Sequence, residues 1–263
     1  MGRSFFVAEA REQVKKEERR LHEIFRRLRR RYGFQGWWPI VSSAGRAGRD
    51  SLGYRTLPGQ PRILPRQRLE IVVGTILTQN TAWENARLAI LSLEREGLLT
   101  STAIRDAGGT RLGETIRSSG YYNQKARKLA GVVSYLEEGG FLSRRGNTAP
   151  PRDELLSQWG VGPETADSIL LYAFAVPRFV IDAYTLRIFG RMGLLGPATS
   201  YGEAQSFFES RLAADADEWG ELHALIVRHA KEYCRTLPLC AECPLLDECA
   251  FGWREKTPHE KSE

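Results

Sequence analysis

The chain has 263 residues, of which 42% are hydrophobic, and carries a formal net charge of +6 with a pI near 9.2. This length suffices for one large domain or two smaller ones with a substantial core. No apolar run is long enough to cross a membrane or resembles a signal peptide, so we expect no membrane partner and a location in the cytoplasm, or in the nucleus if the source has one. The positive charge favours an anionic partner such as nucleic acid.

Helical periodicity begins with residues 8–32. Apolar side chains recur there at steps of three, four or seven residues, as on one face of an amphipathic helix: Val14, Leu21, Ile24, Phe25, Leu28 and Tyr32. Seven arginines between Arg19 and Arg31 lie in the same segment, where they either contact phosphates or form a solvated face.

An aromatic turn and a long loop follow this first helix. Residues 33–39 are rich in aromatic side chains, and residues 41–65 are rich in Gly, Ser, Pro and Arg, which is typical of a surface loop. Over residues 69–179, and again from residue 184 onward, the apolar spacing predicts helices joined by short turns. Strand patterns are nearly absent, so we predict an all-α protein of roughly ten or more helices.

All four cysteines of the chain lie within sixteen residues, with the spacing C-x5-C-x2-C-x5-C: Cys234, Cys240, Cys243 and Cys249. Four thiolates this close can hold one soft metal centre, either an iron–sulfur cluster or zinc. Two disulfides are disfavoured because the sequence shows no export signal. The spacing is unlike the paired C-x2-C knuckles of zinc ribbons, so we expect a cluster and keep zinc as the alternative.

A glycine turn between two predicted helices forms the second notable motif. Gly160-Val161-Gly162 follows a helix that ends near Trp159, and Pro163 stands at the helical position that proline prefers. The two glycines leave backbone N–H groups uncovered at a helix N-terminus, where a phosphate can bind without sequence readout. Val161 is expected to point inward as an anchor. Taken alone, the pattern also suits an ordinary interhelical turn.

A single acid, Asp182, comes directly after three large apolar residues downstream of the glycine turn. This position predicts a carboxylate at the edge of a packed region, at the start of a helix that begins with Ala183. The simpler interpretation is a plain N-cap aspartate. We favour a catalytic carboxylate because the phosphate-binding turn precedes it in the sequence.

The glycine turn, the aspartate loop and the terminal cysteines together resemble the endonuclease III superfamily of DNA glycosylases. The resemblance covers about residues 66–250. It implies two helical lobes, a continuous one over residues 66–178 that contains a helix-hairpin-helix motif, and a discontinuous one made of residues 1–65 and 179–263 that contains the cysteine loop. It also implies a [4Fe–4S] cluster on the four cysteines, and double-stranded DNA with a damaged base as the partner of a monomer.

Two further segments add candidate site residues through the same resemblance. Leu-Thr-Gln-Asn-Thr at residues 77–81 is similar to the family segment whose Gln fills the gap left by an extruded base, which implies that role for Gln79. Residues 120–126 are similar to a family turn that approaches the DNA backbone, which implies contacts from Asn123 and Lys125. The hairpin implies backbone contacts from Gly160, Val161, Gly162 and Thr165.

The sequence departs from the family pattern in two places. The first gap between cysteines is one residue shorter than the commonest spacing, a difference that a loop containing Pro238 can absorb. Bifunctional members have a lysine two residues after the second hairpin glycine, and this chain has Glu164 there. Because a carboxylate cannot form the Schiff base that lyase activity requires, the resemblance implies a monofunctional glycosylase.

The chemistry of base removal suggests the substrate. A glycosylase flips the nucleotide into a pocket, and departure of the base leaves positive charge on the sugar, which Asp182 can stabilise. A lone carboxylate suits a base that is already activated, such as the cationic 3-methyladenine, which electron-rich aromatic faces also attract. Trp38 and Trp83 are the expected pocket residues, because their surroundings are similar to the 3-methyladenine branch of the family.

Two alternatives remain open at the level of sequence. The first is a glycosylase for mismatched thymine, uracil or an oxidised base. The second is a DNA-binding protein without catalytic activity that senses damage.

Overall fold

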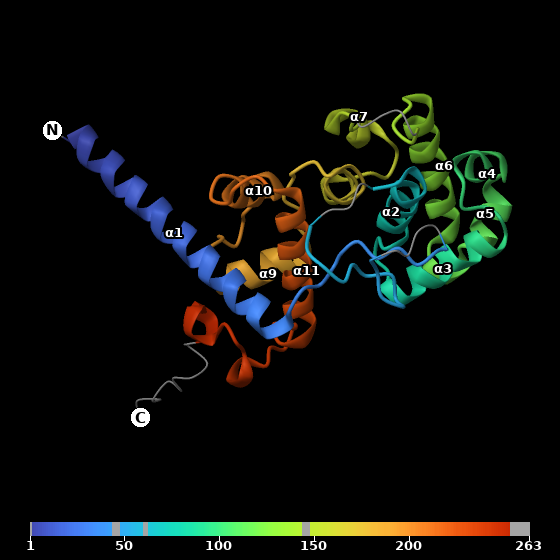
Figure 1. The fold of residues 1–263 in the computed structure, drawn as a ribbon. Coiled ribbons are helices and arrows are strands. Elements are labelled where there is room, and N and C mark those ends of the chain that lie inside the picture. The colour runs from blue at the N-terminus through green and yellow to red at the C-terminus, as the bar shows by residue number, and fades with distance from the viewer. Residues whose placement is uncertain (1, 44–47, 60–62, 144–147, 253–263) are drawn as a thin grey trace. The chain divides into compact units, whose positions relative to one another are not determined.

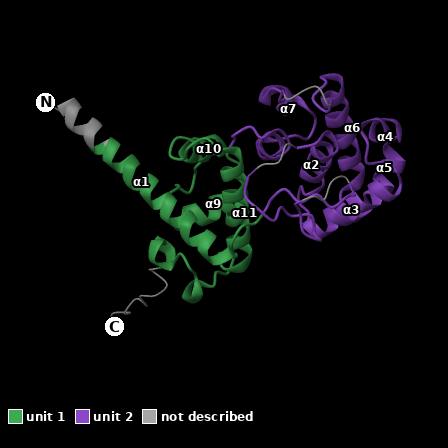
Figure 2. Cartoon of the chain, viewed as in Figure 1, with its two compact units in different colours: residues 1–35, 179–263 green, residues 36–178 purple. Residues whose placement is uncertain are grey.

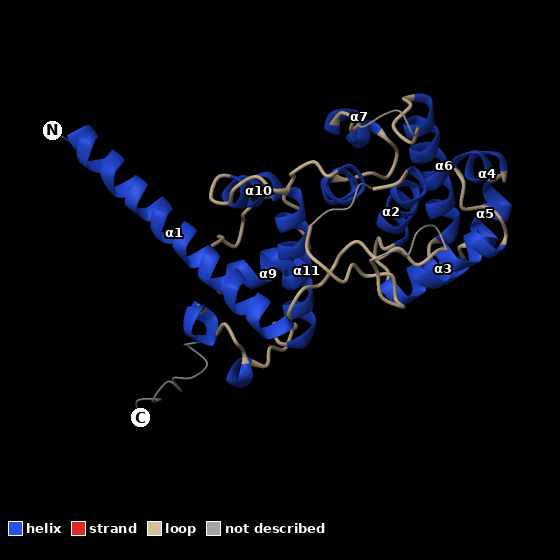
Figure 3. Cartoon of the chain, viewed as in Figure 1, coloured by secondary structure: helices blue, strands red, loops and turns tan. Residues whose placement is uncertain are grey.

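The chain folds into helices connected by turns and loops. The structure is a computed structural model that describes residues 2–43, 48–59, 63–143 and 148–252. Over these residues it contains no strand (Figure 3). The β-type pairing among them is one isolated bridge between Arg49 and Arg55. The predicted all-α class is therefore confirmed. None of the described helices is both long and apolar enough to span a membrane.

Two compact units make up the chain, and Figure 2 colours them separately. The first consists of residues 1–35 and 179–263, and the second of residues 36–178. Helices of the first unit are α1 (Gly2–Tyr32), α9 (Ala183–Arg191), α10 (Tyr201–Glu209), α11 (Ala216–Glu232) and the short turns Cys240–Glu242 and Leu246–Glu248. Helices of the second unit are α2 (Pro65–Leu77), α3 (Trp83–Arg95), α4 (Ser101–Asp106), α5 (Gly109–Thr115), α6 (Tyr122–Glu138), α7 (Arg152–Ser157), α8 (Pro163–Ser168), the 3-10 turn Arg117–Ser119 and a π-helical turn Ile169–Ala173.

The first unit is built around contacts of α11 with α1 and α9 (Figure 1). The predicted apolar face of α1 lies in this core, where Leu21, Ile24 and Leu28 are fully or almost fully buried. In the same unit the ring of Phe179 stacks on the ring of Phe208, with the ring centroids 4.3 Å apart. Burial of one face stabilises a helix whose remaining faces are strongly charged.

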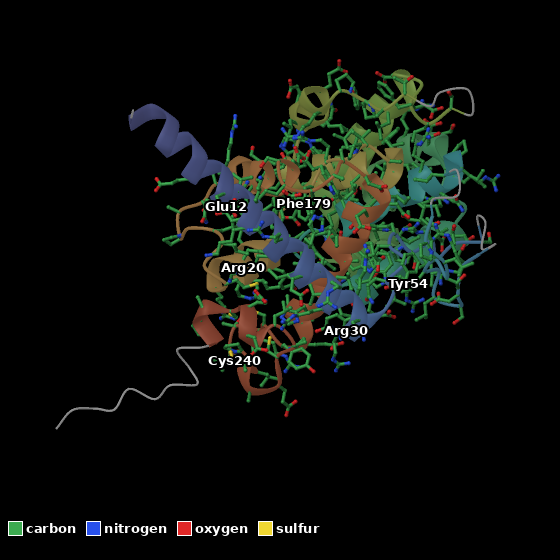
Figure 4. The ribbon with its side chains drawn as sticks, turned by 60° about the vertical axis from the view of Figure 1, so that its left-hand side comes forward. Glu12, Arg20, Arg30, Tyr54, Phe179 and Cys240 are labelled. Carbon is green, nitrogen blue, oxygen red and sulfur yellow. The ribbon has the colours of Figure 1, made fainter. Side chains whose placement is uncertain are left out.

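Most arginines of α1 contact protein groups within the first unit. Arg20, labelled in Figure 4, donates to the Met192 carbonyl at 2.9 Å. Arg29 contacts Glu218, and other members of the run pair with glutamates on their own helix. Most of the arginines between Arg19 and Arg31 therefore form intramolecular contacts on a solvated helix face. This is the second of the two interpretations that the sequence left open.

Helix α2 is the central helix of the second unit. Every residue from Gln67 to Leu77 is buried, and α3, α6, α8 and the π-helical turn pack around it. A helix enclosed on all sides needs apolar residues around its whole circumference, which explains why Ile71-Val72-Val73 is β-branched and still helical. Pro65 stands at its start, where no backbone N–H is required.

The described residues of 36–65 belong to the second unit, whereas the sequence placed them in the discontinuous lobe. The buried carboxylate of Glu70 on α2 holds the start of this segment in the second unit. It accepts hydrogen bonds from the Val41 N–H at 2.6 Å, the Ser42 N–H at 3.2 Å and the Ser42 hydroxyl. A buried carboxylate requires such donors, so it ties the chain after Trp38 to the centre of this unit.

Replacing Glu70 with Ala should destabilise the protein by about 2–3 kcal/mol, because two buried N–H groups and a hydroxyl lose their acceptor. Urea unfolding followed by circular dichroism measures the change. Glu94→Ala is the matched control, since Glu94 accepts from the Ser43 N–H and hydroxyl at the surface. We expect the control to cost less than about 1 kcal/mol, and equal losses from both variants would contradict this account.

Candidate functional site

The predicted glycine hairpin joins α7 to α8. Gly160 has φ +79°, in the left-handed region that glycine adopts without strain. The Val161 N–H donates to the Gln158 carbonyl at 3.1 Å, and the Val161 side chain is buried as expected. Pro163 begins α8, so the hairpin has the local geometry that exposes backbone N–H groups at a helix N-terminus.

An exposed aromatic residue and two cations from α6 border the hairpin. Trp159 is 50% exposed, and the Arg127 guanidinium lies 4.3 Å from the centre of its ring. The Lys128 side chain runs along Gly160 so closely that a Cβ there would lie 2.3 Å from Lys128 Cε. None of these three residues was predicted as a site residue from the sequence. The available signals were that Lys128 follows Lys125 by three residues and that Trp159 directly precedes the glycines.

Gln79 lies just beyond the end of α2 and contacts the hairpin. Its side-chain NH2 donates to the Thr165 hydroxyl at 2.9 Å and to the Gly160 carbonyl at 3.3 Å. Its side-chain oxygen accepts from Lys128 Nζ at 2.6 Å. The structure thus brings Gln79 into contact with Gly160 and Thr165 of the hairpin, although the sequence had placed these candidates in separate motifs.

Lys125 is not placed for the predicted contact with the DNA backbone. It is only 2% exposed, and its ammonium donates to the Leu77 carbonyl, the Ser119 carbonyl and the Thr81 hydroxyl at 2.7–2.8 Å. Burial, with a smaller contribution from the charge of Lys128, lowers the pKa of Lys125 to about 8. The side chain fixes the loop that carries Gln79. Asn123, from the same predicted turn, is exposed.

The tryptophans form an aromatic cluster in the second unit. Trp38 is 9% exposed and packs edge-on against Trp83 at 5.8 Å and against Tyr172 at 5.2 Å. A Cβ on Gly74 would lie 2.9 Å from Trp38 Nε1, so the indole is wedged against α2. Trp37 and Trp83 are only half-buried, and the accessible aromatic surface therefore comes from these two rings while Trp38 supports them.

Asp182 caps α9 and is nearly buried in the first unit. Its Oδ1 accepts from the Thr185 N–H at 2.7 Å and the Thr185 hydroxyl at 2.8 Å, while Oδ2 lies 3.5 Å from His223 Nε2 on α11. Burial raises the pKa of Asp182, but the hydrogen bonds and charge from His223 and Thr185 outweigh it and lower the pKa below its usual value. The N-cap interpretation is correct, and the carboxyl group is also held in its anionic form.

The four cysteines line one cavity of the first unit, on the loop after α11 where Cys240 is labelled in Figure 4. The cavity contains about 360 Å³ of empty space, part of it open to solvent. All four cysteines are half-buried, and none of them forms a disulfide. Arg191 donates to the Cys234 sulfur at 3.3 Å, and burial raises the pKa of Cys243 to about 11. Among the described residues, no three His, Cys, Asp or Glu side chains converge closely enough to hold a single metal ion.

These features define a helix-hairpin-helix protein with a capped aspartate and a cysteine-lined cavity. Residues 73–214 match the family model described as HhH-GPD superfamily base excision DNA repair protein. A protein of Methanocaldococcus jannaschii that is named as a DNA repair glycosylase is 39% identical over 87% of this chain and 95% of its own length. Endonuclease III of Sulfolobus acidocaldarius is 30% identical over 68% of this chain and 80% of its own length.

Solved structures agree with this result. The H. pylori 3-methyladenine DNA glycosylase bound to 1,N6-ethenoadenine is 26% identical with a TM-score of 0.57, covering 65% of this chain and 87% of that one. An endonuclease III–DNA complex gives a TM-score of 0.68 at 20% identity, covers 91% of this chain and 98% of that one, and shows the shared fold. The chain belongs to the HhH-GPD superfamily of base excision DNA repair proteins. The predicted family is thereby confirmed.

Proposed function

We propose that the protein is a monofunctional DNA glycosylase that removes an alkylated purine such as 3-methyladenine from double-stranded DNA. The observation that carries this proposal is the nearly buried Asp182 carboxylate, whose pKa is lowered by His223 and Thr185. An anion that is already oriented can stabilise the positive charge that develops on the sugar as the base departs, without rearranging its surroundings first.

The remaining residues have supporting roles in this proposal. The N–H groups of the hairpin bind a phosphate of the DNA backbone, together with the exposed Asn123. Gln79 occupies the space of the nucleotide that is flipped out of the base stack. Asp182 stabilises the sugar cation and orients the attacking water.

Aromatic surface and the single carboxylate support an alkylated purine as the substrate. Trp37 and Trp83 are half-exposed, and electron-rich rings attract a cationic base. A cationic base is a good leaving group and needs little acid catalysis. The similarity to a 3-methyladenine glycosylase bound to a modified adenine agrees with this choice.

The residue at the usual lysine position supports the absence of lyase activity. Glu164 lies in the first turn of α8, where a carboxylate also interacts favourably with the helix dipole. A carboxylate cannot form a Schiff base with the sugar, so the strand should remain intact after base removal.

We further propose that Cys234, Cys240, Cys243 and Cys249 hold a [4Fe–4S] cluster. The fit rests on four cysteines around one cavity and on the Arg191 guanidinium, which donates a hydrogen bond to the Cys234 sulfur. Such a cluster supplies structural cross-links to a loop too short to build its own core. Zinc on the same four sulfurs is the alternative.

A panel of duplexes, each with one defined lesion, tests the substrate and the reaction together. We expect release of 3-methyladenine, and strand cleavage only after alkaline treatment of the abasic product. Release of uracil, mismatched thymine or oxidised bases alone would contradict the alkylpurine assignment. Cleavage without alkali would contradict the monofunctional assignment.

Asp182→Asn should lower the rate of base release by about 10³-fold, because the sugar cation loses its negative partner. Binding to the lesion duplex, measured by fluorescence anisotropy, should remain. Asp215→Asn is the matched control, since Asp215 caps α11 through the Glu218 N–H at 3.0 Å. A control as impaired as Asp182→Asn would show that the loss reflects capping and not catalysis.

His223→Gln should move the acidic limb of the pH–rate profile to higher pH. The lowered pKa of Asp182 keeps its carboxylate ionised until the pH falls through that value, and removing His223 raises the pKa. Single-turnover rates across pH measure the shift. His22→Gln, at an exposed position on α1, should leave the limb in place. An unchanged profile in His223→Gln would remove His223 from this account.

Anaerobically purified protein should be brown, absorb broadly near ~400 nm and contain iron and sulfide. Cys243→Ser should lose the absorbance and lower the melting temperature, since one of the four ligands is missing. Colourless wild-type protein with stoichiometric zinc would establish the alternative metal.

A further inference from the structure

The Gln79 side chain is docked on the hairpin in the DNA-free protein. Its amide group makes three hydrogen bonds, to the Thr165 hydroxyl, the Gly160 carbonyl and Lys128 Nζ. A side chain held in this way cannot also occupy a gap in a base stack. The role proposed for Gln79 therefore requires that these contacts break when DNA binds.

Of the three contacts, the bond from Lys128 is the shortest and the only one with a charged partner. Charge-assisted hydrogen bonds are about twice as strong as neutral ones, so this bond contributes most to the docking of Gln79. Its acceptor is a neutral amide oxygen, and Lys128 forms no ion pair among the described residues. A DNA phosphate group, whose negative charge is shared by its two non-bridging oxygens, is the better acceptor for the same ammonium.

The Lys128 side chain is also placed where a phosphate is expected. Its stem lies on Gly160, the first glycine of the hairpin, and its ammonium is 5.9 Å from the centre of the exposed Trp159 ring. The neighbouring Arg127 stacks on the same ring at 4.3 Å and adds positive charge at this edge. A phosphate bound by the hairpin N–H groups would thus meet Lys128 directly.

We propose that Lys128 binds a DNA phosphate and that it exchanges the Gln79 amide oxygen for this phosphate when the duplex contacts the hairpin. The exchange frees Gln79 to leave the hairpin. Backbone binding and gap filling are then coupled through a single ammonium group, and Gln79 remains docked until the backbone is engaged. This inference rests on the proposed function, because it needs a DNA duplex at the hairpin and Gln79 in the base stack.

Salt-dependent binding of an undamaged duplex, measured by fluorescence anisotropy, tests the phosphate contact. Lys128→Met should weaken binding and reduce the slope of log K against log salt by about 0.9, the value for one lost phosphate contact. Lys128→Arg should keep the slope. Arg105→Met on α4, which removes an exposed charge paired with Asp106 in the same unit, should leave both affinity and slope unchanged. A wild-type slope in Lys128→Met overturns the proposal.

A double-mutant cycle with Gln79→Ala tests the exchange. With Gln79 absent, Lys128 reaches the phosphate without first breaking a hydrogen bond, so Gln79→Ala should bind undamaged duplex roughly twofold to fivefold more tightly, the range for a partly exposed charged contact. The gain should vanish in the Lys128→Met background. Unchanged or weaker binding by Gln79→Ala, or an equal gain in both backgrounds, overturns the exchange.

Both measurements use undamaged DNA, so they do not depend on catalysis. A protein that shows the expected slopes and cycle but releases no base would retain this inference and lose the proposed activity. A protein that releases alkylated purines with an unaltered slope in Lys128→Met would retain the activity and lose the inference. Circular dichroism melting of each variant confirms folding, and Lys128→Gln replaces Lys128→Met if the latter does not fold.

Discussion

The buried ammonium of Lys125 fixes the loop that follows α2, and the position of Gln79 depends on this contact. It donates a hydrogen bond to the Leu77 carbonyl at the C-terminal end of α2. The same ammonium also donates to the Thr81 hydroxyl and the Ser119 carbonyl. Three acceptors around one donor group fix a loop that has no regular structure of its own. Gln79 lies within that loop, and its position against the hairpin follows from this anchor.

The first unit also contains a buried charge that is held by several contacts. The Asp182 carboxylate caps α9 with one oxygen and lies beside His223 with the other. The apolar residues that precede Asp182 in the sequence are buried and restrict the access of water to its carboxylate. The hydrogen-bond donors of the helix cap compensate the carboxylate for the hydration that it loses. In the proposed mechanism the same arrangement serves stability and catalysis, because an anion that is already held need not be reoriented during the reaction.

Much of the fold and part of the site could be predicted from the sequence. The apolar face of α1, the glycine hairpin with Pro163 and the helical cap at Asp182 all follow from local rules of spacing and capping, and the structure contains each of them. Family membership followed from the same motifs. The place of residues 36–43 could not be predicted, since it depends on Glu70, a residue that reads as an ordinary polar position in a helix.

The sequence by itself determined which chemical groups the protein has: a glycine turn at the start of a helix, one aspartate after an apolar run and four clustered cysteines. These are local patterns, and a few neighbouring residues suffice to specify them. Only the tertiary structure decided which cation is accessible, because Lys125 and Lys128 are separated by one helical turn and no local rule distinguishes them. Packing of α6 against α2 buries the first and leaves the second beside the hairpin, and burial depends on residues distant in the chain.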